Sequence, residues 1–323
     1  MMGAGASATR LLAILSWVRL CCGAYFEPWS PCHRHVGSQR KAMVTGITGM
    51  LGSHTAEALL SRGYKVVGVV RPRSPVRNLV DFRDNISVKI AELTDSSGTF
   101  RLVRDVAPDY IFHFAAQAYN SLSFNDPEYT ISTNVMATLN LLEAVRNLNL
   151  NTTFLIAGSS TVYGAATELY DGTIPESAPM QPVSPYGVSK AATELLALQY
   201  ARTHKLRVVM ARFFIHLATR GTEALALHEF ARQVASIEQG LQDPLILHGD
   251  LSTERDITDI RDSAPAVVCL AEVAPSGTVA NIGSNTSYSI AQLLEGVVKK
   301  SSVKNIELKV DESRYRPYDE KRV

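Results

Sequence analysis

The sequence has almost no net charge, few cysteines and no long apolar run. It holds 32 Lys and Arg against 31 Asp and Glu in 323 residues, a formal net charge of +1. This balance lacks the basic surface that nucleic-acid binding requires. No run approaches the ~20 apolar residues that span a bilayer as a helix. We therefore expect neither a nucleic-acid-binding protein nor an integral membrane protein.

Cysteine is scarce as well. Three of the four Cys lie in residues 1–40, which leaves Cys269 alone in 41–323. A disulfide framework is therefore excluded for that body. With 46% hydrophobic and 20% charged residues, the composition is that of a globular protein with one large or two closely associated domains.

Residues 1–40 differ from the rest in composition. They contain four Arg, one acidic residue and no Lys. An apolar run follows Arg10, as in a secretory signal, but Arg19 interrupts it, and an Arg-rich, acid-poor segment also suits an organellar transit peptide. An unstructured extension, or a start codon chosen too far upstream, is the alternative. For the body, 41–323, we expect a cytoplasmic location.

The body alternates short apolar runs with helical patterns. A run at 41–46 leads through a glycine-rich turn to an amphipathic stretch at 54–62 and a second run at 66–70. This is a βαβ unit. Continued alternation predicts a doubly wound α/β fold, with a parallel sheet covered on both faces. Further strands are expected at 88–90, 110–115, 154–157 and 208–214, and helices at 99–106, 129–148 and 186–204.

Past residue 214 the pattern changes. We interpret 216–255 and 284–323 as a smaller lobe over the carboxyl edge of the sheet, while about 256–283 returns to the main domain of 41–215. In this part we expect helices at 223–239, near 262–272 and at 290–300, short strands at 245–248 and 278–282, and polar turns after 248.

The first turn has the glycine spacing of a dinucleotide site. Gly46, Gly49 and Gly52 form GxxGxxG between a strand and a helix, which is the context that makes such a turn specific. Glycine lets the backbone approach a pyrophosphate, and the helix N-terminus offers free N–H groups. A purely structural turn is the alternative. The predicted cofactor residues here are Gly46, Ile47, Thr48, Gly49, Met50, Leu51 and Gly52.

The end of the second strand favours NADP over NAD. An acidic residue there would accept from a ribose 2′-hydroxyl, but this chain has Arg71, Arg73 and Ser74. Two guanidinium groups and a hydroxyl suit a 2′-phosphate. The alternative is that both arginines are solvated loop residues.

A YxxxK pair starts the helix expected at 186–204. Its spacing places Tyr186 and Lys190 one turn apart on one face. A phenol with pKa ~10 is a poor base at neutral pH, so we expect the ammonium, together with a positive nicotinamide ring, to lower that pKa. Ser159, at the end of a preceding strand, is placed to hydrogen-bond a substrate oxygen. Taken alone, a tyrosine in such a pair is more often a surface residue.

Together these motifs resemble the extended short-chain dehydrogenases/reductases of the NAD-dependent epimerase/dehydratase type, which have a Rossmann-type fold and a smaller C-terminal substrate-binding lobe. The resemblance is strongest to the nucleotide-sugar branch around GDP-mannose 4,6-dehydratase and GDP-4-keto-6-deoxymannose reductase. The stretches that carry it are TGITGMLGS, VVRPRS, AELTD, FHFAAQ, SPYGVSK, ARFFIH, ERDITDIRD and RYRP.

The resemblance implies roles at matching positions and no metal site. Ser159, Tyr186 and Lys190 match the catalytic residues, and Lys190 could also hold the nicotinamide ribose. Arg255 and Arg314 would bind the diphosphate of a sugar nucleotide, although Arg255 could instead pair with a neighbouring Asp, Asp256 or Asp259. The further cofactor contacts that it implies are Glu92, Leu93, Phe114, Ala115, Ala116, Gln117, Ala118, Tyr129, His216 and Arg220.

Three departures from this family pattern bear on function. Thr161 stands where the dehydratases have a catalytic Glu, and a hydroxyl is not a useful general base. Ile215 replaces an Asn that precedes His216. The chain also ends soon after Arg316, where the family continues, so we expect the substrate lobe to be truncated.

The resemblance therefore favours a lyase that converts GDP-mannose to GDP-4-keto-6-deoxymannose by internal hydride transfer through NADP. Thr161 keeps two alternatives open, a GDP-4-keto-6-deoxymannose reductase and a nucleotide-hexose 4-epimerase. A catalytically impaired NADP-binding sensor is a further alternative. By resemblance alone, we expect a homo-oligomer that binds a nucleotide sugar, with GDP as the favoured nucleotide.

Overall fold

The computed structural model describes residues 40–222, 225–315 and 320–323. These residues form two compact units, one from 40–213 and 260–282 and the other from 214–259 and 283–323. We call them the sheet unit and the small unit. The predictions for 1–39 lie outside the described residues. Within the described ranges, no helix combines the length and the apolar character needed to cross a membrane.

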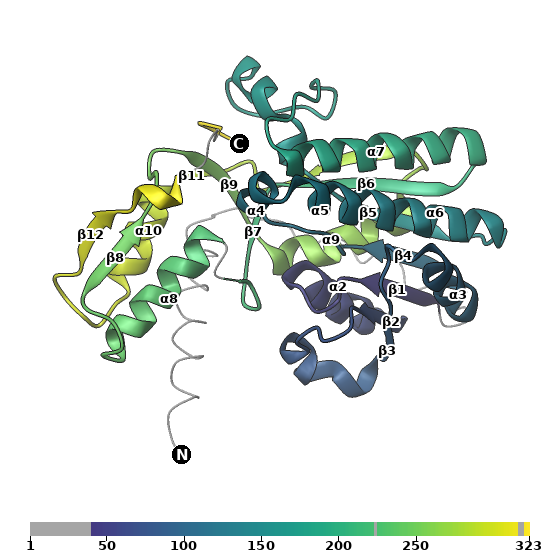
Figure 1. Ribbon diagram of the computed structural model, residues 1–323, viewed down its shortest axis with the longest axis horizontal. Helices are drawn as coiled ribbons and strands as arrows, with labels where there is room; N and C mark the ends of the chain where they lie inside the picture. Colours follow the sequence, from purple (N-terminus) through teal and green to yellow (C-terminus); the bar gives the residue numbers. More distant parts are fainter. Residues whose placement is uncertain (1–39, 223–224, 316–319) are drawn as a thin grey trace. The chain divides into compact units, whose positions relative to one another are not determined.

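The sheet unit contains a seven-stranded parallel sheet in the order β10-β6-β5-β4-β1-β2-β3 (Figure 1). The chain moves outward from β1 to β3 and then returns to the other side of β1 for β4. The predicted doubly wound fold is thereby confirmed, and the carboxyl ends of β1 and β4 mark the switch point where such folds bind ligands. The strands are β1 (Lys41–Thr45), β2 (Lys65–Val70), β3 (Ser87–Ile90), β4 (Tyr110–His113), β5 (Thr153–Ser159), β6 (Arg207–Phe213) and β10 (Thr278–Ile282).

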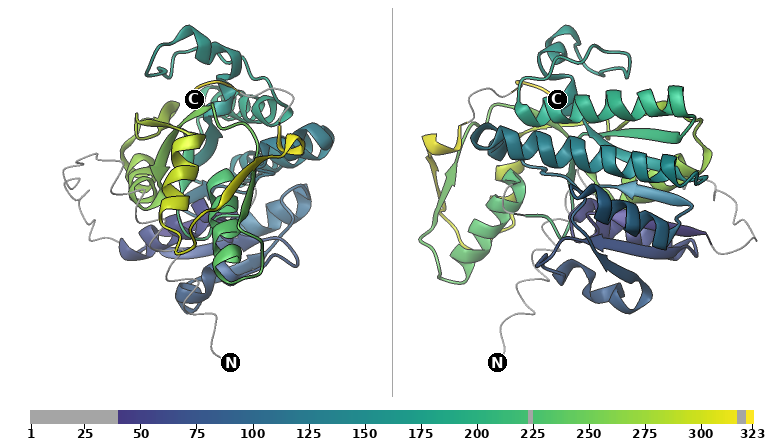
Figure 2. Two further views of the ribbon diagram at one scale, coloured as in Figure 1. Left: turned by 90° about the vertical axis from the view of Figure 1, so that its left-hand side faces the viewer. Right: turned by 45° about the vertical axis from the view of Figure 1, so that its right-hand side comes forward.

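Helices cover both faces of this sheet (Figure 2). On β1, Ala42 and Val44 belong to one apolar core and Met43 to the other, because successive side chains point to opposite faces. Burial on both faces explains why β1 reads as an unbroken apolar run. One face carries α2 (Met50–Ser61) and α9 (Ile260–Val273), and the other carries α3 (Ser96–Val106), α6 (Ala137–Asn147) and α7 (Pro185–His204).

The helix predicted at 129–148 is present as three consecutive segments. They are α5 (Pro127–Ile131), the π turn η2 (Ser132–Met136) and α6. Inside the π turn, the carbonyl of Asn134 accepts a hydrogen bond from the Thr138 hydroxyl at 2.9 Å. The short helical segments that complete the sheet unit are η1 (Arg77–Asn85), α4 (Asn120–Asn125), η3 (Ser160–Val162) and η4 (Gly164–Leu169).

The small unit has its own apolar core, formed by Leu227, Phe230 and Leu294 among others. In its larger sheet, the middle strand pairs in parallel with one neighbour and antiparallel with the other. Its elements are β7 (Ile215–Leu217), α8 (Ala226–Glu238), β8 (Leu245–His248), β9 (Glu254–Asp259), β11 (Ser287–Ser289), α10 (Ile290–Lys299), β12 (Glu307–Val310) and η5 (Glu312–Arg314).

The polar turns predicted after residue 248 were wrong for 254–259. This charged segment is the strand β9, and five of its six residues are buried. Burial is tolerated because the polar groups are paired. The Asp256 carboxylate, for example, accepts from the backbone N–H of Ser284 at 2.8 Å and of Asn285 at 2.6 Å. Such long-range partners leave no periodic pattern in the sequence.

A buried ion pair joins α7 to β6 in the sheet unit. The Arg212 guanidinium donates to both carboxylate oxygens of Glu194, at 2.9 and 2.5 Å, and the two side chains are only 4% and 1% exposed. Arg212 also donates to the Tyr163 hydroxyl at 2.7 Å and to the Glu176 carbonyl at 2.9 Å. The Tyr163 hydroxyl donates in turn to Asn281 on β10 at 2.6 Å. This cluster connects the strands β6 and β10, the helix α7 and the two loop segments that hold Tyr163 and Glu176.

We expect Glu194→Gln to lower the free energy of unfolding by about 3–5 kcal/mol, because it leaves the guanidinium buried without its counter-charge. Urea denaturation of the full chain measures this. The control is Glu295→Gln, which removes the exposed pair with Lys299 on α10, 2.7 Å apart and worth about 0.5 kcal/mol. Equal losses for the two variants would contradict the assignment.

Candidate active site

The glycine turn after β1 packs closely against the segment that follows β4. Gly46 has φ +67°, and a Cβ at that position would lie 2.7 Å from the backbone nitrogen of Ala115. Gly49 caps α2 and, as a glycine, has no side chain that could accept from the first N–H groups of the helix. The Asn78 amide donates to the Thr48 carbonyl at 2.8 Å and braces the turn. Backbone N–H groups are thus presented at the switch point.

Arg71 and Tyr129, distant in sequence, meet in the structure. Arg71 donates to the Tyr129 hydroxyl at 2.9 Å, and both side chains are exposed. Arg73 lies in the same turn, in a left-handed conformation with φ +64°, and the N–H of Ser74 closes the turn on the Arg71 carbonyl. The arginine side chains just after β2 are therefore exposed cations at the carboxyl edge of the sheet.

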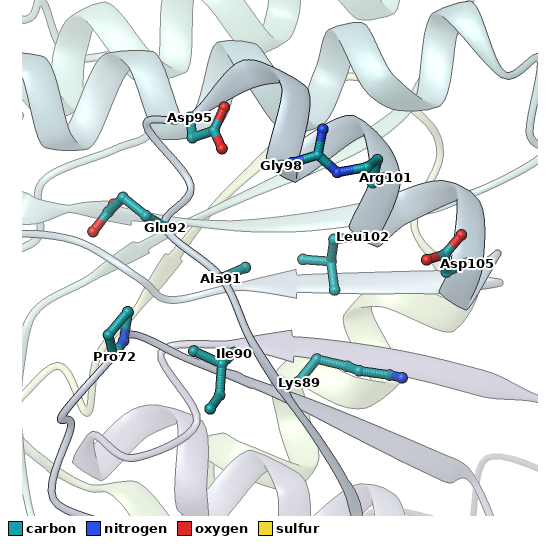
Figure 3. A pocket seen from close by; sticks show the side chains of 10 residues that line it. All are labelled: Pro72, Lys89, Ile90, Ala91, Glu92, Asp95, Gly98, Arg101, Leu102 and Asp105. Carbon is teal, nitrogen blue, oxygen red and sulfur yellow. The ribbon is translucent and has the colours of Figure 1, made fainter.

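A cavity of about 390 Å³ lies between β3 and α3, and Pro72, just after β2, is among its lining residues (Figure 3). Its lining includes Glu92, one of the predicted cofactor residues, but none of Ser159, Tyr186 and Lys190. The side chains of Glu92 and Lys89 point in opposite directions in this view, so the charges do not converge on one ligand atom. Leu93, the residue after Glu92, is buried.

Ser159, Tyr186 and Lys190 come together where β5 ends and α7 begins. Ser184 caps α7 by accepting from the N–H of Gly187 at 3.1 Å, which places Tyr186 in the first turn. The Lys190 ammonium donates to the carbonyl of Ala157 on β5 at 2.8 Å and lies 5.8 Å from the centre of the Tyr186 ring. The Ser159 side chain lies close enough to the Tyr186 phenol to lower its pKa.

The electrostatics of this group differ from the expectation. Burial raises the pKa of Tyr186 to about 12, and only the hydrogen bond with Ser159 acts in the opposite direction. Burial likewise lowers the pKa of Lys190 to about 8. The expected lowering of the phenol pKa requires the nicotinamide as well as Lys190. In the chain by itself desolvation dominates, and the Lys190 amine donates to a backbone carbonyl.

Thr161 adjoins the serine. Its hydroxyl donates to the Ser159 hydroxyl at 2.9 Å, and its N–H donates to the same oxygen at 3.2 Å. A threonine hydroxyl used in this way orients Ser159 and supplies no general base.

Asn134, in the π turn, was not identified from the sequence. Its amide donates to the Ser189 hydroxyl at 2.8 Å, and its side-chain oxygen accepts from the N–H of Gln117 at 2.7 Å. Ser189 donates in turn to the Tyr186 carbonyl at 2.7 Å. Asn134 thus connects the segment 114–117, where cofactor contacts were predicted, to the helix of Tyr186. A π turn is common at functional sites but leaves no recognisable sequence signal.

The four other predicted site residues lie in the small unit. His216 is buried on β7, where its Nδ1 lies 3.1 Å from the Phe214 carbonyl and burial lowers its pKa to about 4. Arg220 has φ +69°. Arg255 is also buried, and its guanidinium donates to two backbone carbonyls, of Glu254 at 2.7 Å and of Glu320 at 2.8 Å.

Arg314 is the more accessible of the two arginines predicted to bind the diphosphate. Its side chain is 34% exposed and pairs with Asp311 at 3.1 Å and with Glu229 at 3.5 Å. Glu229, which the sequence analysis did not identify, also accepts from Arg232 at 2.7 and 2.8 Å. The carboxylate therefore holds two arginines in one cluster of the small unit.

Curated relatives cover most of this chain. A GDP-mannose 4,6-dehydratase of Vibrio cholerae is 33% identical over 277 residues, which are 82% of this chain and 73% of the relative. A GDP-6-deoxy-D-mannose reductase of Pseudomonas aeruginosa is 31% identical over 288 residues, 88% of this chain and 87% of the relative.

Solved structures share the fold. The reductase RMD of Pseudomonas aeruginosa, complexed with NADPH, superposes with a TM-score of 0.73 at 29% identity and covers 88% of both chains. A UDP-glucose 4-epimerase of Thermotoga maritima with UDP-glucose gives a TM-score of 0.76 at 25% identity, over 87% of this chain and 88% of the other.

The family model described as GDP-mannose 4,6 dehydratase matches residues 43–323. This match covers nearly the whole body and includes both units, and it confirms the resemblance seen in the motifs. The chain belongs to the GDP-mannose 4,6-dehydratase family, within the extended short-chain dehydrogenases/reductases.

Proposed function

We propose that the chain is an NADP-dependent enzyme of nucleotide-sugar metabolism that exchanges hydride at C4 of a hexose. The observation that carries this proposal is the meeting of Ser159, Tyr186 and Lys190 at the carboxyl end of β5. GDP-mannose 4,6-dehydratase activity is the first candidate, since relatives with that name are among the most similar.

The residues at the carboxyl edge fit a dinucleotide. A side chain at Gly46 would collide with the backbone of the segment after β4, so this position requires glycine. A glycine turn that opens a helix is the arrangement in which backbone N–H groups approach a pyrophosphate. Arg71, Arg73 and Ser74 offer charge-assisted and neutral donors to a 2′-phosphate. One structural neighbour is complexed with NADPH and another, a Thermus thermophilus UDP-glucose 4-epimerase, with NAD. The arginines favour NADP for this chain.

When bound, the nicotinamide accepts and returns a hydride. Tyr186 removes the hydroxyl proton at C4, so that the C4–H electron pair leaves with the hydride as the ketone forms. Ser159 donates to the same oxygen and orients it. Because the pKa of the phenol lies near 12 in the protein alone, the phenolate needs nearby positive charge, which Lys190 supplies from its fixed position on Ala157.

Thr161 limits the chemistry available once the ketone has formed. Elimination of water across C5–C6 requires a base at C5 and an acid at the C6 hydroxyl, and the Thr161 hydroxyl supplies neither at useful strength. A ketone reduction needs only Ser159, Tyr186 and Lys190. Reduction of a 4-keto sugar is therefore the second candidate, supported by the similarity to a reductase along 87% of its length. Nucleotide-hexose 4-epimerisation needs the same residues, and the keto sugar must rotate so that the hydride returns to its other face.

The small unit is proposed to hold the sugar nucleotide, favoured to be GDP-linked. Arg314 is partly exposed and charged, as a diphosphate ligand must be. Arg255 is proposed to act with it, and His216 and Arg220 to contact the cofactor. Apolar side chains exposed on α5 and α7, among them Ile131 and Leu195, suit pairing of two copies of the chain.

The product of the reaction tests the proposal. Full-length protein is incubated with GDP-mannose and NADP⁺, or with the 4-keto-6-deoxy sugar nucleotide and NADPH, and the product masses are read. Loss of water from GDP-mannose identifies a dehydratase, and NADPH consumption with the ketone identifies a reductase. In the matched variant Thr161→Glu, we expect water elimination to appear or to rise about tenfold or more. No turnover on either substrate, or on UDP-hexoses, would overturn the enzymatic proposal and favour an NADP-binding sensor.

Cofactor choice is predicted to depend on the two arginines. Replacing both Arg71 and Arg73 by Ala should weaken NADPH binding by about 10–100-fold and leave NADH binding within about threefold, since only the former has a 2′-phosphate. Fluorescence titration measures both dissociation constants. The control is Arg104→Ala on α3, an exposed arginine that pairs with Asp105. Parallel weakening of NADPH and NADH would contradict the assignment.

Burial of the Lys190 amine predicts how the stability of the chain depends on pH. Its pKa is about 8 in the folded chain, below the ordinary value of 10.5, so between pH 8 and 10.5 the unfolded chain binds more protons and stability rises with pH. Below pH 8 the full cost of the buried ammonium is present. We therefore expect Lys190→Met to be more stable than the unmodified chain by about 1–3 kcal/mol at pH 7, with the difference shrinking as pH rises through that window.

Urea denaturation at a series of pH values measures this difference. The control is Lys299→Met on α10, whose amine is largely exposed and pairs with Glu295. A stability difference that stays flat between pH 8 and 10.5 for Lys190→Met would show that its amine is not desolvated.

A further inference from the structure

A continuous chain of buried hydrogen bonds runs through His113, at the end of β4. The N–H of Ala115 donates to the Thr45 hydroxyl at 3.2 Å, and that hydroxyl lies 2.7 Å from His113 Nδ1. On the other side of the ring, Nε2 lies 3.1 Å from the Thr138 hydroxyl. Thr138 donates to the Asn134 carbonyl at 2.9 Å. The side chains of Thr45, His113, Thr138 and Asn134 are at most 3% exposed.

The donors and acceptors of this chain determine the tautomer of the ring. A hydroxyl has one proton to give, and Thr138 gives its proton to a carbonyl, which can only accept. The Thr138 oxygen must therefore accept from His113, so Nε2 carries the hydrogen. Nδ1 is then the acceptor for Thr45, whose own oxygen accepts from the Ala115 N–H. Every group has one consistent role.

The ring is also held neutral. Burial lowers the pKa of His113 to about 3, and the nearby Lys190 ammonium acts in the same direction. A protonated ring would place a second donor against Thr45 and a second cation near Lys190. Neutrality therefore preserves both the hydrogen-bond chain and the environment of the lysine.

Beyond Asn134 the chain reaches the catalytic helix. The Asn134 side chain binds the backbone of Gln117, and its amide donates to Ser189, which donates to the Tyr186 carbonyl. Thr45 lies directly before Gly46, the first residue of the glycine turn. The two ends of the chain are thus the turn proposed to hold the pyrophosphate and the helix proposed to carry the acid–base residues.

We propose that His113, as its Nε2–H tautomer, is a positioning residue that sets the glycine turn and the Tyr186 helix in mutual register for the two ends of the dinucleotide. The link to turnover rests on the proposed function. The alignment of the glycine turn with the Tyr186 helix does not rest on that function, because it follows from hydrogen bonds within the chain. A rigid imidazole suits this role because its two nitrogens point away from each other, one toward each threonine.

The tautomer is directly observable. In ¹⁵N NMR of the full chain with labelled histidine, the His113 signals are assigned by their disappearance in His113→Gln. We expect a neutral Nε2–H ring that does not titrate between pH 5 and 9. A ring with hydrogen on Nδ1, or one that titrates in this range, would overturn the proposal.

Two matched Thr→Val variants test the positioning role. Thr138→Val removes a hydroxyl from the chain. Thr55→Val removes an equally buried hydroxyl on α2 that has no hydrogen-bond partner among the described residues. We expect Thr138→Val to lower kcat about tenfold with KM for the sugar nucleotide within about twofold, Thr138→Ser to restore it, and Thr55→Val to leave it unchanged. Equal effects of the two valine variants would overturn the proposal.

The binding of NADPH separates this proposal from the proposed reaction. Loss of the register should weaken NADPH binding about tenfold in His113→Phe and in Thr138→Val. The double variant should be no weaker than His113→Phe, because both changes break one chain. These measurements need no substrate, so they decide the proposal even if the chain turns over no sugar nucleotide. Unchanged NADPH affinity in both variants, or strictly additive losses, would overturn it.

Discussion

The contact between the Lys190 ammonium and the Ala157 carbonyl is the interaction on which the proposed site depends. It ties the first turns of α7 to the end of β5, and so places Tyr186 beside Ser159. The same contact makes the group costly, since an amine buried at this depth loses hydration and its pKa falls to about 8. The phenol beside it is equally desolvated. Such opposed shifts, produced by burial at one edge of a sheet, are typical of acid–base sites.

The sheet unit tolerates this cost because two further groups of buried polar side chains in it are paired. Arg212 meets Glu194 and Tyr163 behind the site, and His113 joins Thr45 to Thr138 beneath it. Fully satisfied networks of this kind are rigid, since each donor has one partner and each alternative arrangement leaves a buried group unpaired. Rigidity at these positions is useful where a hydride must travel between two molecules held by different segments of the chain.

In the proposed mechanism, one side chain separates the possible reactions. The family model is that of a dehydratase, and relatives include a reductase, while fold neighbours include epimerases. The proposed hydride step uses Ser159, Tyr186 and Lys190, whereas elimination of water needs a further base, which the Thr161 hydroxyl, bonded to Ser159, does not supply. A site can therefore keep the hydride step and lose the elimination step, because the two steps use different groups.

Local patterns in the sequence determined a large part of this protein. Alternating strands and helices predicted the parallel sheet, the glycine spacing predicted the tight turn at Gly46, and the YxxxK spacing placed Tyr186 and Lys190 on one turn. These features follow from backbone geometry within a few residues, which the sequence encodes directly.

Tertiary structure alone decided the rest. The strand β9 forms from charged residues because distant backbone groups pair with Asp256. In the chain by itself the pKa of Tyr186 is raised, because burial outweighs the opposing effect of Ser159. The π turn at Asn134 and the tautomer of His113 depend on partners from other elements. Desolvation and long-range hydrogen bonds arise only when segments far apart in the chain meet, so no local pattern records them.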